Sequence, residues 1–202
     1  GSNVSGNQYT NASMEWDFYG GFNGKINDDL GYTAGLIYVV YPGGKTSLTP
    51  PNEKWDTAEI NAGLSWKWLS AKVSYSLTNF YGIGKNGFVP VKFDDPAVSA
   101  ADNAASPDDS DGSIYTELNF NYELPMKVNL LAHVGHQKIN NYKELDYTDW
   151  KLGAAKEFYR FNFMLAYTDT NAKDFTLFHL SNGTEDKKLA DGKVALTVTK
   201  TF

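Results

Sequence analysis

The clearest feature of the sequence is a two-residue alternation of apolar and polar positions. In the stretch 192–202, Val194, Leu196 and Val198 alternate with small polar residues such as Thr197. Such alternation predicts a β-strand whose two faces meet different surroundings. The same pattern recurs along the chain and predicts about nine strands, at 13–23, 30–40, 58–68, 71–78, 115–124, 127–135, 150–154, 161–167 and 192–202. The chain is therefore predicted to be all-β.

The connections between these strands alternate between short and long. Short turns are predicted at 26–29, 69–70, 125–126 and 157–159, and long polar connections at 42–55, 81–112, 140–147 and 169–191. Bacterial outer-membrane barrels have short turns at one end and long loops at the other, with strands of about 9–11 residues. A soluble antiparallel sheet has no reason to sort its connections in this way. The pattern therefore favours an antiparallel transmembrane β-barrel over the alternative, a soluble β-sandwich.

Composition agrees with a barrel. The mean hydropathy of -0.43 is that of a water-soluble protein, yet aromatic residues make up 15% of the chain. No stretch approaches the roughly 20 apolar residues of a transmembrane helix, and the best candidate, 30–40, is too short. A barrel reconciles these facts because half of each strand faces lipid and half faces water. Aromatic residues such as Trp66, Trp68, Phe158 and Tyr159 also gather near predicted strand ends, where the lipid–water interface is expected.

The last residue points to the same compartment. Phe202 ends an alternating strand, and a terminal Phe on the closing strand is characteristic of bacterial outer-membrane proteins, where it serves as a signal for the barrel-assembly machinery. The chain has no cysteine, which excludes a disulfide framework and a thiolate metal site. The net charge of -6 argues against nucleic acid as a partner. We therefore expect a protein of the bacterial outer membrane, in contact with membrane lipid and lipopolysaccharide.

The predicted number of strands indicates that residues 1–202 do not form a closed barrel by themselves. If the final strand ends in the periplasm, the stretch 13–23 runs toward the periplasm and residues 1–12 lie outside. Bacterial single-chain barrels have an even number of strands, and an open sheet edge is untenable in lipid. An odd number of strands, at least one, is therefore expected to precede residue 1, and 1–202 is expected to form a single barrel domain with its N-terminal strands missing.

The sequence offers little catalytic chemistry. His133 and His136 are three residues apart, so they point to opposite faces of a strand, and His179 lies in a predicted loop. No Gly-x-Ser-x-Gly nucleophile motif occurs. We predict that the protein is not an enzyme and uses no cofactor or metal. The acidic run 108–112 lacks the spacing and the closing Glu of a calcium loop, so a solvated acidic loop is the preferred interpretation.

Charged residues share the polar face of the predicted strands. The candidates for lining a channel are Glu15, Asp17, Glu59, Lys67, Lys72, Glu117, Glu123, Lys127, His133, Lys151, Arg160 and Lys193. A polar, charged wall is what a water-filled pore requires, since rings of side-chain charge set ion selectivity. The two signs nearly balance. Two interpretations therefore stay open: an open channel, or a lumen closed by charges that pair across it.

Short motifs along the chain add a resemblance. They are YVVYPG at 38–43, EINAGLS at 59–65, NFYG at 79–82, YELP at 122–125, HVGH at 133–136, DWKLG at 149–153, YTDTN at 167–171 and VTKTF at 198–202. In this order, and over nearly the whole chain, they resemble the TorF-like porin family. The resemblance implies a barrel of about twelve strands, of which this chain holds the C-terminal nine or so. The acidic insertion 94–111 departs from the family pattern.

These observations favour one function and keep a second in view. We expect a passive channel for small hydrophilic solutes or ions, because charge lies on the inward faces of the predicted strands. The alternative is a closed barrel that acts through its extracellular loops, in surface contacts or envelope integrity. The acidic insertion at 94–111 favours that alternative.

Overall fold

A single antiparallel sheet dominates the computed structural model, which describes residues 1–3, 12–46, 51–90, 108–173, 175, 179–181 and 186–200. Its long strands are β2 (Met14–Lys25), β3 (Leu30–Val40), β4 (Thr57–Trp66), β5 (Leu69–Ser76), β6 (Ile114–Leu124), β7 (Val128–Lys138), β8 (Tyr147–Phe158), β9 (Phe161–Thr170) and β12 (Lys193–Lys200). The all-β prediction is therefore confirmed. Phe202 and the acidic segment 94–107, both singled out above, lie outside the described residues.

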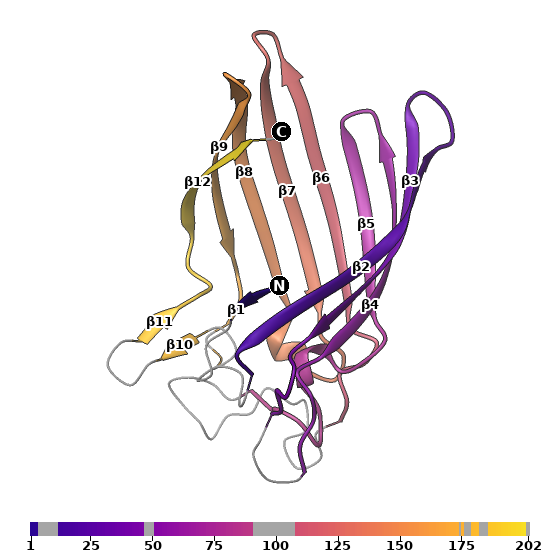
Figure 1. The fold of residues 1–202 in the computed structure, drawn as a ribbon, viewed down its shortest axis with the longest axis vertical. Coiled ribbons are helices and arrows are strands. Elements are labelled where there is room, and N and C mark those ends of the chain that lie inside the picture. Colours follow the sequence, from indigo (N-terminus) through magenta and orange to yellow (C-terminus); the bar gives the residue numbers. More distant parts are fainter. Residues whose placement is uncertain are drawn as a thin grey trace.

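The strands follow one another through the sheet in chain order. The ten-stranded order is β1-β2-β3-β4-β5-β6-β7-β8-β9-β12, and Figure 1 shows that the sheet curves like part of a cylinder wall. The short β1 (Ser2–Asn3) pairs with Glu15 and Met14 at the start of β2. Within the described residues no pairing joins β12 to β2, so the sheet is not closed into a barrel.

The remaining elements are short and lie in the long connections. These are the 3₁₀ helices η1 (Phe80–Gly82) and η2 (Lys143–Leu145), and the separate hairpin of β10 (His179–Ser181) and β11 (Asp186–Lys188). No helix in the described part of the chain has the length and apolar character needed to cross a membrane.

Short and long connections lie at opposite ends of the sheet. The turns 26–29, 67–68, 125–127 and 159–160 gather at the upper end in Figure 1. The described residues of the four long connections gather at the lower end: 41–46, 51–56, 77–90, 108–113, 139–146, 171–173, 175, 179–181 and 186–192. We call these the short-turn end and the long-loop end. The alternation of loop lengths predicted from the sequence is therefore also a separation in space.

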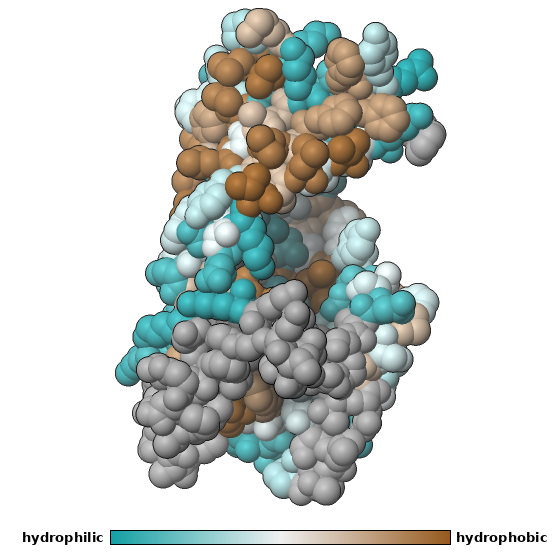
Figure 2. Space-filling view, turned by 90° about the vertical axis from the view of Figure 1, so that its left-hand side faces the viewer, coloured by the Kyte–Doolittle hydropathy of each residue, from teal (hydrophilic) through white to brown (hydrophobic). Residues whose placement is uncertain are grey.

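Strand register divides the side chains into two unlike faces. Cross-strand partners such as Leu64 with Tyr32, and Leu165 with Leu196, lie on one face, and this outer face is apolar. Its side chains are nonetheless exposed: Val194 is 70% exposed and Leu196 67%. Figure 2 shows apolar residues gathered in the half of one side nearer the short turns, with hydrophilic residues below them. The other face, the inner wall, carries mostly polar and small residues.

The buried core lies in the loops rather than in the sheet. Ile83, Ile139, Tyr142, Leu145 and Phe175 form one buried cluster, to which three long connections contribute. A second cluster joins the end of β3 to neighbouring loop residues, and consists of Ala12, Val39, Tyr41 and Trp55. We call the two clusters together the loop body. It packs against the inner wall, because the inward-facing Val39, Thr57 and Ser76 are buried while the outward-facing Tyr38 and Tyr75 stay exposed.

Candidate functional site: the inner wall

The inner wall carries the charged residues that the sequence pattern assigned to it. Nine of the twelve candidates occupy inward-facing positions of the strands: Glu15, Asp17, Glu59, Lys72, Glu117, Glu123, His133, Lys151 and Lys193. The other three, Lys67, Lys127 and Arg160, lie in turns at the short-turn end, each with a positive φ. Whether these residues line a pore stays a prediction.

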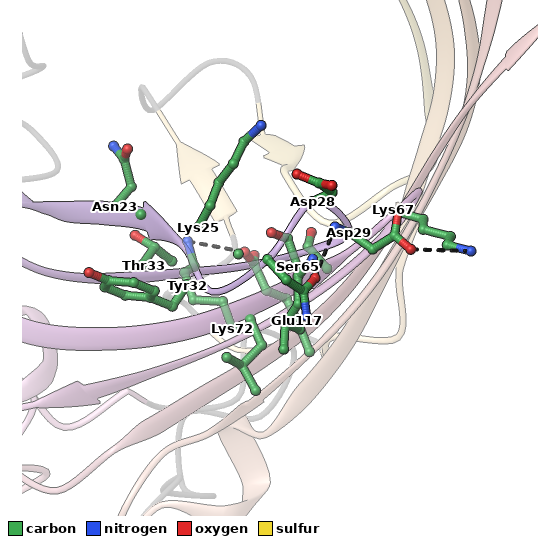
Figure 3. A pocket seen from close by; sticks show the side chains of 17 residues that line it. Asn23, Lys25, Asp28, Asp29, Tyr32, Thr33, Ser65, Lys67, Lys72 and Glu117 are labelled. Atoms are coloured by element: carbon green, nitrogen blue, oxygen red, sulfur yellow. Dashed lines mark hydrogen bonds and ion pairs between the residues drawn. The ribbon is translucent and has the colours of Figure 1, made fainter.

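A cavity of ≈ 510 Å³ opens on the inner wall of β2 to β6, near the short turns. Figure 3 shows that its charged and polar side chains come from several strands and from the turn between β2 and β3. Lys72 Nζ lies 3.0 Å from Glu117 Oε1, and Lys67 Nζ lies 3.5 Å from Asp29 Oδ2. A second hollow adjoins it and shares Asn23, Thr33 and Lys72. Polar groups therefore line a continuous depression along the wall.

Four side chains form a hydrogen-bonded group beside this depression, which we call the Tyr115 cluster. His133 Nε2 lies 2.9 Å from Asp149 Oδ1, and His133 Nδ1 lies 2.7 Å from Asn119 Oδ1. The Tyr115 hydroxyl donates to Asp149 Oδ2 over 3.0 Å and lies 3.1 Å from His133 Nε2. The cluster joins β6, β7 and β8 and gives each of its four side chains a hydrogen-bonding partner, as partly buried polar groups require.

A glycine makes room for this cluster. A Cβ atom on Gly135 would overlap the Tyr115 hydroxyl and lie 2.8 Å from Asp149 Oδ2. Only a residue without a side chain lets the Tyr115 ring lie flat across β7 to reach Asp149 on β8. The geometry of the cluster thus depends on one backbone position.

The loop body closes over the inner wall at the long-loop end. The Tyr41 hydroxyl donates to Glu15, so this predicted wall carboxylate contacts a buried residue of the loop body. Ser76 Oγ donates to Glu59 over 3.3 Å at the same end of β4 and β5. The predicted carboxylates Glu15 and Glu59 are therefore held by neighbours, whereas the charged groups near the short turns surround a cavity.

The acidic run 108–112 is anchored more firmly than a solvated loop. Asp108 and Asp111 are exposed as expected, but Ser110 is fully buried: its hydroxyl donates to the Ile83 carbonyl over 2.6 Å and accepts from the Phe80 N–H over 2.8 Å. Such short side-chain to backbone bonds replace regular secondary structure in a turn.

An ion pair holds the half-buried Asp109 of this run. Lys85 Nζ lies 2.8 Å from Asp109 Oδ2. Burial alone would raise the pKa of the Asp109 carboxyl. Hydrogen bonds from Lys85 and Asn79 outweigh burial and hold this pKa below its usual range. In the described part of the chain, no group of three or more His, Cys, Asp or Glu side chains is arranged to hold a metal ion.

Sequence reasoning missed several wall residues for identifiable reasons. Lys25 and Asp149 lie on the inner wall, but the strands predicted there ended at 23 and began at 150. Tyr115 and Asn119 were passed over because they carry no charge. Each of the four lies an even number of positions from a predicted candidate on its own strand, such as Glu117 or Lys151, and therefore points to the same face. This spacing is the signal that could have found them. The side chain of His179 lies outside what the structure describes.

Comparison with known proteins gives a family match. The sequence model of a family described as "Bacterial protein of unknown function (Gcw_chp)" matches residues 1–202. No curated protein and no solved structure matches the chain. The family match spans every strand of the sheet and both faces described above.

Proposed function

The chain belongs to the Gcw_chp family of bacterial proteins of unknown function, and we propose that its sheet forms part of the wall of an outer-membrane β-barrel through which small hydrophilic solutes or ions diffuse passively. The observation that carries the proposal is the contrast between the faces of the sheet. The outer face is apolar yet exposed, and the inner wall is polar, charged and hollowed. The resemblance to the TorF-like porin family supports the same function.

The exposed outer face supports a location in the membrane. Soluble proteins rarely expose continuous apolar patches of more than a few hundred Å², yet here apolar side chains face outward along all nine long strands. Aromatic residues of the outer face gather near the short turns, where Trp68 packs against Phe120 with ring centroids 5.2 Å apart. Aromatic side chains prefer the lipid–water interface, so they would form the girdle on the periplasmic side.

The edges of the sheet support a larger barrel, because within the described residues β2 pairs beyond β3 only with the short β1, and β12 pairs only with β9. In lipid, unpaired backbone N–H and C=O groups find no water, so each edge must be covered. Pairing of β1 with the start of β2 indicates the direction in which a further strand would run along that edge. A barrel of about twelve strands covers both edges with about three strands in addition to the nine long ones, as the family resemblance implies.

Other partners follow from this location. Outer-membrane lipid and lipopolysaccharide would contact the outer face, and the barrel-assembly machinery would recognise the C-terminal strand β12 with Phe202. The short turns would lie in the periplasm and the loop body outside the cell, since long loops of such barrels are extracellular.

The loop body favours a second candidate, a closed barrel that acts through its extracellular loops. Packed, hydrogen-bonded loops present a fixed surface to other molecules, and this loop body also covers part of the inner wall. The same feature in an open channel would narrow its outer entrance. The two candidates differ in one measurable property, ion conduction.

Conduction of the full-length protein in planar bilayers tests the proposal. We expect discrete current steps that scale with salt concentration. Under a salt gradient, Glu117→Gln should shift the reversal potential toward anion preference and Lys72→Gln toward cation preference, because the two residues form an ion pair beside the cavity. Leu118→Ala, one residue away on the outer face, is the control and should leave selectivity unchanged.

The opposite results are equally clear. A barrel that folds and inserts but never conducts would contradict the channel and favour the loop-mediated function. Conduction that none of the inner-wall variants alters would place the ion path elsewhere.

A further inference from the structure

We propose that the outer face carries a binding site for an anionic phospholipid headgroup, built from Lys156 on β8 and Lys200 on β12 with two phenyl rings of β9 between them. The proposal rests on the membrane location argued above but not on conduction.

Charge is almost absent from the outer face, which makes these two lysines conspicuous. Among the outward positions of the nine long strands, the charged residues are Lys138, Lys156, Asp169 and Lys200. Lys138 and Asp169 lie at the long-loop end, and Tyr167 donates a hydrogen bond to Asp169 there. Lys156 and Lys200 lie toward the short-turn end, so the charged residues at the described outward strand positions of the short-turn half are both positive.

Strand register places the two lysines around one aromatic pair. Lys156 is the cross-strand partner of Phe163, and Lys200 is the partner of Phe161, so both flank β9 on the same face. The Phe161 and Phe163 ring centroids are 6.4 Å apart. The Lys200 ammonium lies 4.9 Å from the Phe161 ring centroid. Two lysine side chains therefore border an exposed apolar patch.

This combination fits a phospholipid at the membrane surface. A lysine on the lipid-facing side is costly at the middle of the bilayer and tolerated near its boundary, where its ammonium can reach headgroups. Two lysines together attract a phosphate more strongly than one. The phenyl rings would contact the upper acyl chains, while Lys156 and Lys200 would bind the phosphate.

The position on the barrel selects the kind of lipid. The short-turn end would face the periplasm, and the leaflet on that side consists of glycerophospholipids. The outward surface nearby offers no carboxylate in the described strands that would repel a negative headgroup. We therefore assign the site to anionic glycerophospholipids such as phosphatidylglycerol rather than to neutral ones.

Native mass spectrometry of the full-length protein in mild detergent tests the assignment. Phosphatidylglycerol and phosphatidylethanolamine are added in equal amounts, and the lipid retained on the folded protein is counted. The double variant Lys156→Gln/Lys200→Gln should retain less phosphatidylglycerol, by about fivefold for each lysine removed. Lys138→Gln, which removes an outward lysine at the other end, is the matched control and should bind like the wild type.

Three further measurements keep the proposal open to refutation. Lys156→Arg/Lys200→Arg should retain the lipid, and retention by the wild-type protein should fall as salt rises, which needs no variant. Equal retention by the Gln and wild-type proteins, or equal binding of the two lipids, would overturn the proposal. Heat-modifiable migration on gels checks folding. A protein that folds and binds phosphatidylglycerol without conducting would refute the channel and leave this site standing.

Discussion

At the scale of single residues, Gly135 and Tyr115 show how the inner wall is packed. Tyr115 does not stand upright from β6 but reaches across β7 to Asp149 on β8, above the space that a side chain at Gly135 would fill. The Tyr115 hydroxyl thereby contacts both His133 and Asp149, which also contact each other directly. The cluster joins three strands, so its loss should destabilise all three of them rather than the wall at one position.

Gly135→Ala should therefore destabilise the folded protein by about 1–3 kcal/mol. The new methyl group would displace the Tyr115 hydroxyl and leave His133 and Asp149 with fewer partners. Urea unfolding of the protein refolded in lipid vesicles measures the effect. Gly20→Ala is the control, because a Cβ there meets nothing within 4 Å and faces outward. Equal stability of the two variants would contradict the packing described for Tyr115.

Tyr142 offers a prediction about pH. Its burial, with the nearby carboxylates Asp109, Asp108 and Glu53, raises its pKa to about 12. The folded pKa exceeds the usual value of about 10, so Tyr142 stabilises the loop body fully below pH 10, and this contribution is lost as pH rises through 12. In a titration of protein labelled with ¹³C at tyrosine Cζ, a resonance that titrates near pH 12 in the wild-type protein should be absent from Tyr142→Phe. A Tyr142 resonance that titrates near pH 10 would contradict the burial.

At the scale of elements, the alternation of residue types predicted every long strand, and the errors lie at strand ends. β8 extends to Phe158, beyond the predicted end at 154, because Lys156 stands at an outward position where an apolar residue was expected. β7 likewise continues through the outward His136 and Lys138. No alternating pattern in the sequence predicts the short strands β10 and β11. Pattern reasoning fails where the outward residues stop being apolar, which under the proposed membrane location is where they leave the lipid.

The turn between β8 and β9 is a weak element that substitution should improve. Tyr159 and Arg160 both have positive φ, 50° and 66°, as a two-residue hairpin turn of type I′ requires. This conformation costs a residue with a Cβ about 1–2 kcal/mol. Tyr159→Asn with Arg160→Gly should raise the free energy of unfolding by about 1–2 kcal/mol, measured as a shift of the urea midpoint. A lower midpoint would indicate that the two side chains hold the turn through other contacts.

At the scale of the whole molecule, the sheet has one apolar face and one polar face. The sequence alone predicted this division, because the face on which a residue lies depends only on whether its position along the strand is odd or even. It could not predict the loop body, whose buried contacts join residues far apart in the chain, such as Tyr142, which donates to the Asp108 carbonyl. Nor could it predict the Tyr115 cluster, which depends on side chains that cross from one strand to another.

Adjacent residues of β12 can tell which solvent each face meets. Leu196 points outward and Thr197 inward. In vesicles, Leu196→Arg should cost about 2–4 kcal/mol, because it places a charge against lipid, while Thr197→Arg should be nearly neutral on a wetted wall. Urea titration in vesicles compares the two. If both variants are neutral, the outer face lies in water and the membrane location is wrong.

The position of the buried core has a consequence for how this protein tolerates sequence change. In most globular proteins, loops accept substitutions and strands resist them. Here Ser110, Ile139 and Tyr142, all in connections, are fully buried, whereas an outward residue such as Val194 needs only to remain apolar and an inward one such as Asn23 only to remain polar. Variation among functional copies should therefore be freest along the strands, within each face's character, and narrowest at the buried positions of the loop body.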